Sequence, residues 1–206
     1  MKQEALQYAR NTFIIEARAI RDTGERMDWD AFSQAVNLLA HAERIAVSGC
    51  GHSGIACQHF AHSMCCIERP ARFLYPSEAV HGATGFLQPG DVLAAASRGG
   101  RTAELLPIIE IARKKGASVI TITEDTESQM ARLSDVVLPL SVHHEADRFD
   151  TQGTSSFAAL SAVFDALQVA VMEETGFRTE QFALIHPGGA VGEKLNQTPY
   201  VNRISR

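Results

Sequence analysis

The chain has 206 residues, of which 45% are hydrophobic and 21% are charged. This length fits one domain with a sizeable core, and the composition excludes a disordered or fibrous chain. The formal net charge is -5 and the basic residues are scattered, so we expect neither nucleic acid nor a membrane surface as a partner.

The first twenty residues mix charged and apolar side chains, so no secretion signal or membrane span is predicted there and we expect a cytoplasmic protein. Four cysteines lie between positions 50 and 66, and the adjacent pair Cys65 and Cys66 disfavours an ordinary disulfide. Histidines lie among these cysteines. Ligands spread along one loop and one helix do not make the separated pairs of a structural zinc site, so neither a metal nor another cofactor is predicted.

Hydrophobic periodicity predicts a chain in which helices and strands alternate. Two helices come first. One carries the apolar stripe Leu6, Ala9, Phe13, Ala17 and Ile20, and the other spans about 32–39. Strands are expected at 44–48, 71–74, 91–96, 118–122 and 135–138, and later helices after 49–54 to about 66, over 102–115, between the last two strands, and over 154–174 and 179–184. This order favours an α/β three-layer sandwich with a five-stranded parallel sheet, as one domain over 1–206.

Two loops that follow strands are candidates for holding an anion. Gly49–Gly54 lets a ligand approach the backbone, and Ser97–Thr102 offers hydroxyls, guanidinium groups and glycines before a helix. The first loop also approximates the dinucleotide-binding spacing, but 72–75 lacks the acidic residue that would bind a ribose. For the second loop, an ordinary helix cap with both arginines in solvent stays open as an alternative.

Four segments in order carry a resemblance: SGCGHSG at 48–54, YPSEAVHG at 75–82, SRGGRTAE at 97–104 and HPGGAVG at 186–192. Over roughly 35–195 the chain resembles the sugar isomerase (SIS) domain family, and within it the branch of the arabinose 5-phosphate isomerases. The resemblance implies an aldose-ketose isomerase of sugar phosphates. It also implies a homo-oligomer, a dimer or a homotetramer, with active sites at subunit contacts.

The resemblance also assigns roles to single residues. Acid-base chemistry is implied for one glutamate in the helix after the second loop, for another after the last strand, and for two histidines. Which glutamate is the base stays open. The implied catalytic residues are Glu104, Glu145, His186 and His81, and the implied phosphosugar-binding residues are Gly51, Ser53, Ser97, Arg98, Gly99 and Thr102.

Two departures from the isomerase branch touch the predicted site. His52 stands where lysine is usual, and SRGGRT replaces a serine-rich loop, so Arg98 and Arg101 are candidates to restore the missing positive charge. We expect His52 to steady an oxyanion. The departures favour a different phosphosugar or a different division of labour. The chain ends at Arg206, so we expect none of the CBS domains that follow many such isomerases.

Moving a proton between neighbouring carbons through an enediol needs a base and donors for the developing oxyanion, which carboxylates and imidazoles supply. From the resemblance, the leading prediction is an arabinose 5-phosphate/ribulose 5-phosphate isomerase. Two alternatives stay open. One is a phosphosugar-binding sensor without catalysis, and the other is a hexulose 6-phosphate isomerase of the same fold.

Overall fold

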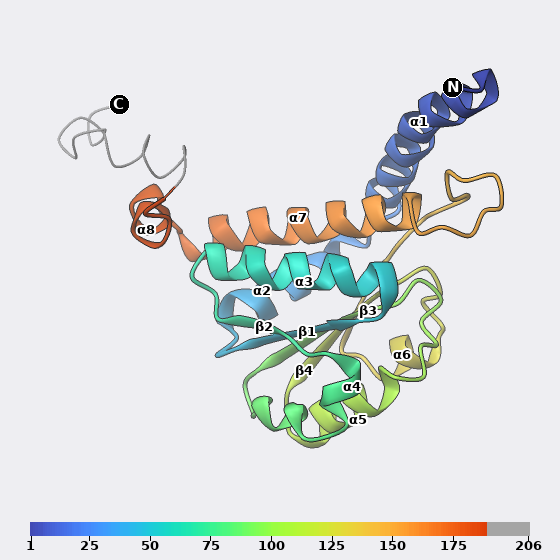
Figure 1. Ribbon diagram of the computed structural model, residues 1–206. Coiled ribbons are helices and arrows are strands. Elements are labelled where there is room, and N and C mark those ends of the chain that lie inside the picture. Colours follow the sequence, from blue (N-terminus) through green and yellow to red (C-terminus); the bar gives the residue numbers. More distant parts are fainter. Residues whose placement is uncertain (189–206) are drawn as a thin grey trace.

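A computed structural model describes residues 1–188, and Gly189–Gly192 of the last motif lie outside that range. A five-stranded parallel sheet in the order β2-β1-β3-β4-β5 forms the centre, with helices on both faces (Figure 1). The predicted α/β sandwich is confirmed. The strands are β1 Ile45–Gly49, β2 Ala71–Phe73, β3 Val92–Ala96, β4 Ser118–Thr123 and β5 Val136–Pro139.

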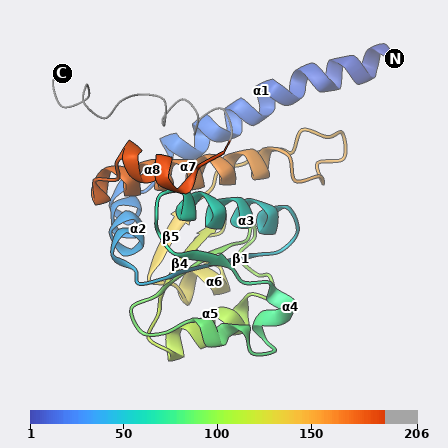
Figure 2. The same cartoon turned by 60° about the vertical axis from the view of Figure 1, so that its left-hand side comes forward.

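The helices lie in two layers (Figures 1 and 2). The first layer holds α2 Trp29–His41, α3 Gly51–Cys66, α7 Ser155–Thr175 and the C-terminal part of α1 Gln3–Glu25. The second holds α4 Pro76–Ala79, the 3-10 helix η1 Ala83–Phe86, α5 Leu106–Lys114 and α6 Gln129–Arg132. The chain then continues from α7 into α8 Thr179–Ile185.

The strands are apolar on both sides because each face of the sheet is covered by helices. Ile45 and Val47 of β1 belong to the core beneath α2, α3 and α7, whereas Ala46 between them belongs to the core on the α5 side. All five residues of β1 and of β3 are buried. A parallel sheet brings all the strand C-terminal ends to one edge, where the loops predicted to hold an anion emerge.

The apolar stripe predicted on α1 is exposed, and a different face of this helix packs on the domain. Thr23 and Ala19, near the C-terminal end of α1, are buried, but Phe13 of the stripe is 79% exposed. The second half of α1 packs on α7 through the face of Ala19 and Thr23, while its first half projects from the domain (Figure 2). The stripe therefore has no cover within residues 1–188 of one chain.

Helix α5 begins later than the sequence predicts, at Leu106 instead of Thr102. Pro107 accounts for the difference, because its ring would clash with the carbonyl of Ala103 if the helix extended back that far. Proline fits the first turn of a helix, and Pro107 lies there. Glu104 therefore lies in the turn before α5 and not in the helix itself.

Helix α7 is the only helix of residues 1–188 that is long and apolar enough to cross a membrane. Its packing gives another reason for this composition. The helix contacts α1, α2 and α3, and the ring of Phe164 stacks on Phe60 with the centroids 4.3 Å apart. We therefore describe α7 as the central helix of its layer.

Candidate functional site

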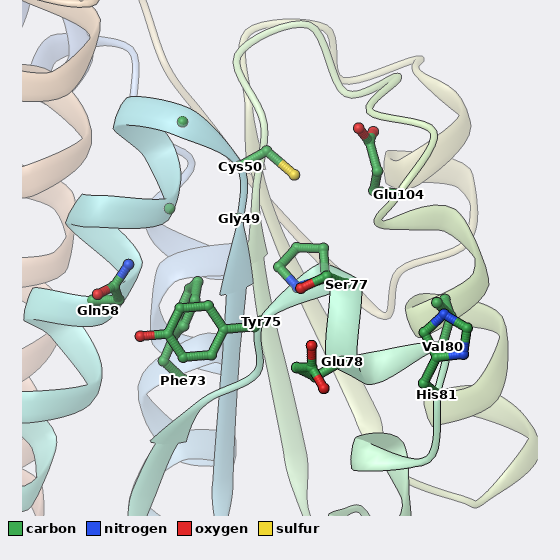
Figure 3. A pocket seen from close by; sticks show the side chains of 13 residues that line it. Gly49, Cys50, Gln58, Phe73, Tyr75, Ser77, Glu78, Val80, His81 and Glu104 are labelled. Atoms are coloured by element: carbon green, nitrogen blue, oxygen red, sulfur yellow. The ribbon is translucent and has the colours of Figure 1, made fainter.

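A cleft of about 600 Å³ opens beyond the C-terminal ends of β1 and β2 (Figure 3). Its walls come from three segments of the chain: the end of β1 with the first turns of α3 at 49–58, the segment 73–81, and the turn that carries Glu104. In open parallel sheets, ligands bind at this edge because loops and helix N-termini converge there. We call this feature the strand-end cleft.

Two of the predicted catalytic residues, Glu104 and His81, line the strand-end cleft together. The side chain of Cys50 points toward the same space as Glu104 (Figure 3). Burial raises the pKa of the Cys50 thiol, and the nearby negative charge of Glu104 raises it further. A carboxylate and an imidazole that line one cleft are suited to acid-base catalysis. The carboxylate can accept a proton from carbon, and the imidazole can exchange a proton with an oxygen.

The loop after β3 is held in shape from within. The hydroxyls of Ser97 and Thr102 hydrogen-bond to each other at 2.8 Å. Gly100 has a φ of +62°, and a side chain there would overlap the Ser128 hydroxyl. Among the hydrogen bonds of the described chain, none uses the backbone N-H groups of Gly99 or Thr102. The loop thus presents a fixed set of open donors, as an anion site requires.

The first glycine-bearing loop is shorter than the sequence suggests, because α3 already begins at Gly51. A side chain at Gly54 would lie 2.6 Å from the carbonyl oxygen of Gly49, so this glycine serves the close approach of helix to strand. Gly51 and Gly54 line the strand-end cleft, and Ser53 is half-buried beside them. The first turn of α3 therefore directs its N-terminus toward the cleft.

His52 is exposed in the same turn of α3 and contacts another part of the chain. A side chain at Gly153 would lie 2.7 Å from His52 Nδ1, so the imidazole packs directly on that glycine. Gly153 comes just before α7. His52 therefore lies beside the segment that leads into α7.

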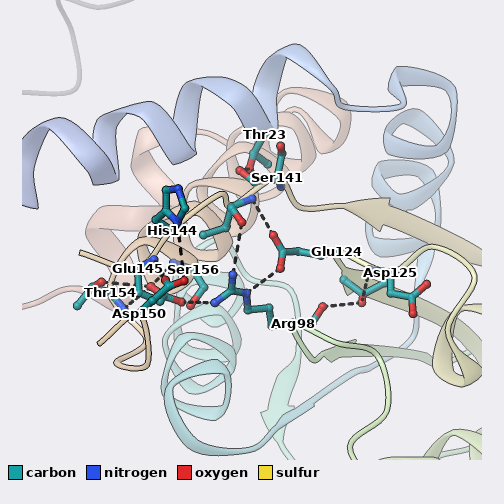
Figure 4. A network of polar contacts seen from close by, with 12 residues as sticks. Thr23, Arg98, Glu124, Asp125, Ser141, His144, Glu145, Asp150, Thr154 and Ser156 are labelled. Carbon is teal, nitrogen blue, oxygen red and sulfur yellow. Dashed lines mark hydrogen bonds and ion pairs between the residues drawn. The ribbon is translucent and has the colours of Figure 1, made fainter. Parts of the chain in front are cut away.

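Arg98, predicted to bind phosphate, is engaged with carboxylates (Figure 4). Its Nε donates to Glu124 Oε2 at 2.7 Å, its Nη1 donates to Glu145 Oε1 at 2.8 Å, and its Nη2 donates to the Val142 carbonyl at 3.4 Å. The two ion pairs join the loop after β3 to the end of β4 and to the segment after β5. We call these groups, with Thr154 and Ser156, the Arg98 cluster.

Glu145 is only 4% exposed and caps the N-terminus of α7. Its Oε2 accepts hydrogen bonds from Thr154 N at 2.9 Å and from Ser156 N at 3.2 Å. Burial works to raise the pKa of Glu145, but the hydrogen bonds from Ser156 and Thr154 outweigh it, so its pKa lies below the ordinary value. The structure does not bring Glu145 to the strand-end cleft that Glu104 and His81 line.

His186 follows α8, where its ring stacks on Phe182 with the centroids 3.7 Å apart. Gln181 of α8 donates to Glu68, which lies just past the C-terminal end of α3. The strand-end cleft is at the N-terminal end of α3, so His186 and the cleft lie at opposite ends of this helix. One chain does not bring His186 together with Glu104 and His81.

Some residues at these sites were not among those predicted from the sequence. Cys50 and Glu78 line the strand-end cleft, and Glu124 holds Arg98. A signal was present for each, because Cys50 and Glu78 lie inside two of the quoted motifs and Glu124 directly follows β4. Within residues 1–188, no group of three or more histidine, cysteine or acidic side chains is arranged to hold a metal ion.

The family model of the SIS domain matches residues 38–170 of this chain. Arabinose 5-phosphate isomerase KdsD of Pseudomonas aeruginosa is 34% identical over 187 residues, which is 91% of this chain and 57% of that protein. The chain thus spans less than two thirds of the length of this curated relative.

Two solved structures are similar over nearly the whole fold. A Listeria monocytogenes protein described as a candidate sugar-phosphate isomerase is 42% identical, with a TM-score of 0.87, and the match covers 91% of this chain and 100% of that one. An Escherichia coli CFT073 protein in complex with A5P is 27% identical, with a TM-score of 0.83 and the same coverage. The matched domain and these likenesses show that the chain belongs to the SIS domain family.

Proposed function

We propose that this protein is an aldose-ketose isomerase of sugar phosphates, with arabinose 5-phosphate and ribulose 5-phosphate as the first pair to test. The observation that carries the proposal is the meeting of Glu104 and His81 on one cleft at the strand ends. The relatives named as arabinose 5-phosphate isomerases and the neighbour that holds A5P support this substrate class.

In the proposed reaction the phosphate lies at the loop after β3. The open N-H groups of Gly99 and Thr102 and the hydroxyls of Ser97 and Thr102 donate to it. Gly51 and Ser53, in the first turn of α3, complete this anion site from the other loop. Because these contacts are the same for an aldose and a ketose, they provide binding and not the selection of one over the other.

The chemical step moves one proton between neighbouring carbons. Glu104 removes the proton from C2 of the open-chain aldose and returns it to C1, while His81 transfers the proton between the two oxygens of the enediol. His52 is the neighbour of Gly51, which lines the cleft, and in this proposal it steadies the charge on oxygen. The carbonyl group thereby moves from C1 to C2 and the hydroxyl group from C2 to C1, so the step needs no external oxidant or reductant.

A second copy of the chain supplies His186 in this proposal. The 16 residues of α3 separate His186 from the cleft by roughly 24 Å at 1.5 Å per residue. The uncovered apolar stripe of α1, including the exposed Phe13, supports self-association as a dimer or tetramer. Mixing the inactive Glu104→Gln and His186→Ala proteins tests this directly, because shared sites recover part of the activity and sites within one chain recover none.

The cytoplasm is the compartment we propose for this reaction. All four cysteines are free thiols, and Cys65 is exposed. Free thiols persist where the surroundings are reducing. Alkylation of the protein in intact cells, followed by mass spectrometry, checks the proposal, and a disulfide at these cysteines in freshly lysed cells would contradict it.

A substrate panel with a chelator present tests the activity itself. Arabinose 5-phosphate, ribose 5-phosphate, fructose 6-phosphate and 3-hexulose 6-phosphate are offered in turn, and aldose-ketose interconversion is followed. Turnover of arabinose 5-phosphate supports the proposal as stated, and turnover of the hexulose phosphate alone moves the substrate to that class. Tight binding without any turnover overturns the isomerase proposal in favour of a sensor.

A further inference from the structure

The guanidinium group of Arg98 is occupied on three sides by its own chain (Figure 4). It donates to two carboxylates, of Glu124 at 2.7 Å and Glu145 at 2.8 Å, and also to a carbonyl. Glu124 is fixed in turn, because its Oε1 accepts a hydrogen bond from Val142 N at 2.7 Å. Arg98 therefore holds the segment after β5 against the ends of β3 and β4.

Both carboxylate oxygens of Glu145 are already used. Arg98 occupies Oε1, and the backbone and hydroxyl of Thr154 together with Ser156 N occupy Oε2. A general base needs a lone pair that faces the substrate carbon, and a carboxylate that accepts several charge-assisted hydrogen bonds is a weak base. Glu104 is exposed on the cleft and accepts no such hydrogen bonds from the described residues.

For Arg98 to bind a phosphate, its guanidinium would have to leave Glu145. That would leave a carboxylate with 2% of its side chain exposed without its charge partner, which is strongly unfavourable. The open N-H groups of Gly99 and Thr102 in the same loop offer an anion a site without this cost. Arg98 and the phosphate therefore do not compete for the same position.

We infer that Arg98 is a positioning residue which, together with Glu124, fixes Glu145 as the anionic cap of α7 and leaves proton transfer to Glu104. The cap also fixes Gly153, on which His52 packs, so the clamp sets the position of the imidazole. The structural part of this inference stands on the Arg98 cluster alone, and the assignment of Glu104 rests on the proposed function.

Amide hydrogen exchange tests the clamp without any substrate. Lysine at position 98 keeps one positive charge but cannot hold both carboxylates, so Arg98→Lys should speed exchange at Thr154 and Ser156 by about tenfold or more. Arg101→Lys is the matched control. It changes a neighbouring arginine whose ion pair is with Asp125 and not with Glu145, and it should leave those two amides unchanged. Equal exchange in wild type and Arg98→Lys would overturn the clamp.

Binding of inorganic phosphate separates a clamp from an anion ligand. Arg98→Lys should keep the affinity within about threefold, whereas Ser97→Ala with Thr102→Ala should lower it by about tenfold or more. If Arg98→Lys weakens phosphate binding as much as the double variant and leaves the α7 amides protected, Arg98 is a phosphate ligand and the inference is wrong.

The pH profile of turnover tests the last part of the inference. Glu145→Gln should lower kcat while it keeps the acid limb of the profile, because Glu104 remains the base, and KM should stay within about threefold. Loss of the acid limb in Glu145→Gln would make Glu145 the base. If the wild-type protein turns over no sugar phosphate, the proposed function fails, while the exchange and phosphate experiments still decide the clamp.

Discussion

The two halves of the strand-end edge treat their polar groups in opposite ways. Beyond β1 and β2, Glu104, His81 and Cys50 line an open cleft. Toward β4 and β5, Arg98 from the loop after β3 and Glu145 from the segment after β5 bind each other and their neighbours. The same edge of the sheet therefore has an open cleft on one side and a closed ionic cluster on the other.

This difference shows that residue type and position at a strand end do not by themselves identify a catalytic group. Glu104 and Glu145 are both carboxylates near strand ends, but only Glu145 is buried, capped by N-H donors and paired with an arginine. A carboxylate that is already paired with an arginine stabilises the fold, whereas a carboxylate that faces an open cleft can react with a bound substrate.

The largest expected effect is on the cleft side. Glu104→Gln removes the proposed base and keeps the size of the side chain, so turnover should fall by about 10² to 10⁴-fold while binding of the sugar phosphate stays within about tenfold. Steady-state kinetics and calorimetric titration measure the two quantities. A variant that turns over normally would mean that the open cleft is not the site of proton transfer.

The next effect sharpens the role of the loop after β3. Ser97→Ala together with Thr102→Ala removes two hydroxyl donors, so the affinity for every sugar phosphate tested should fall by about tenfold to a hundredfold, with kcat little changed. Titration with several sugar phosphates makes the measurement. A loss confined to one sugar would show that these hydroxyls read the sugar and not the phosphate.

A third effect belongs to the closed side and depends on pH. The pKa of Glu145 is depressed below 4.5 in the folded chain, so its ionised form stabilises the fold above that pH and loses this contribution as pH falls. Glu145→Gln weakens the charged hydrogen bonds to Arg98 and to α7, so it should be less stable than wild type by roughly 2 kcal/mol near pH 7. Urea unfolding from pH 7 to pH 3 measures the difference, which should narrow below about pH 4.5. A gap that is constant over this range would show that the carboxylate charge is not what stabilises α7.

The smallest expected effect uses Cys50 as a reporter of the charge on Glu104. Burial and the Glu104 carboxylate both raise the Cys50 pKa, so Glu104→Gln removes the second influence and should speed alkylation at pH 8 by about two- to threefold. Site-resolved mass spectrometry follows the reaction, and the exposed Cys65 provides the internal control. An unchanged Cys50 rate would place the Glu104 charge outside the cleft.

Much of the fold was predictable from local patterns. Short apolar runs such as Ile45–Gly49 and Val92–Ala96 matched strands to within a residue or two, because a doubly covered parallel strand must be apolar throughout. The start of α5 was misplaced, although Pro107 was a visible signal for it. The helix α1 was predicted correctly, but its buried face carries Ala19 and Thr23 and not the predicted stripe, because periodicity does not reveal which face of a helix has a partner within its own chain.

The sequence alone determined the α/β alternation, the two glycine-bearing loops and the motifs shared with the SIS domain family. Periodicity and turn chemistry are local properties, so they can be recognised without a structure. The direction of Arg98 was decided only by the tertiary structure, because its partners lie 26 and 47 residues away along the chain. The separation of His186 from the cleft was also decided only by the tertiary structure. Which end of α3 the last helix packs against depends on how the helices are layered on the parallel sheet.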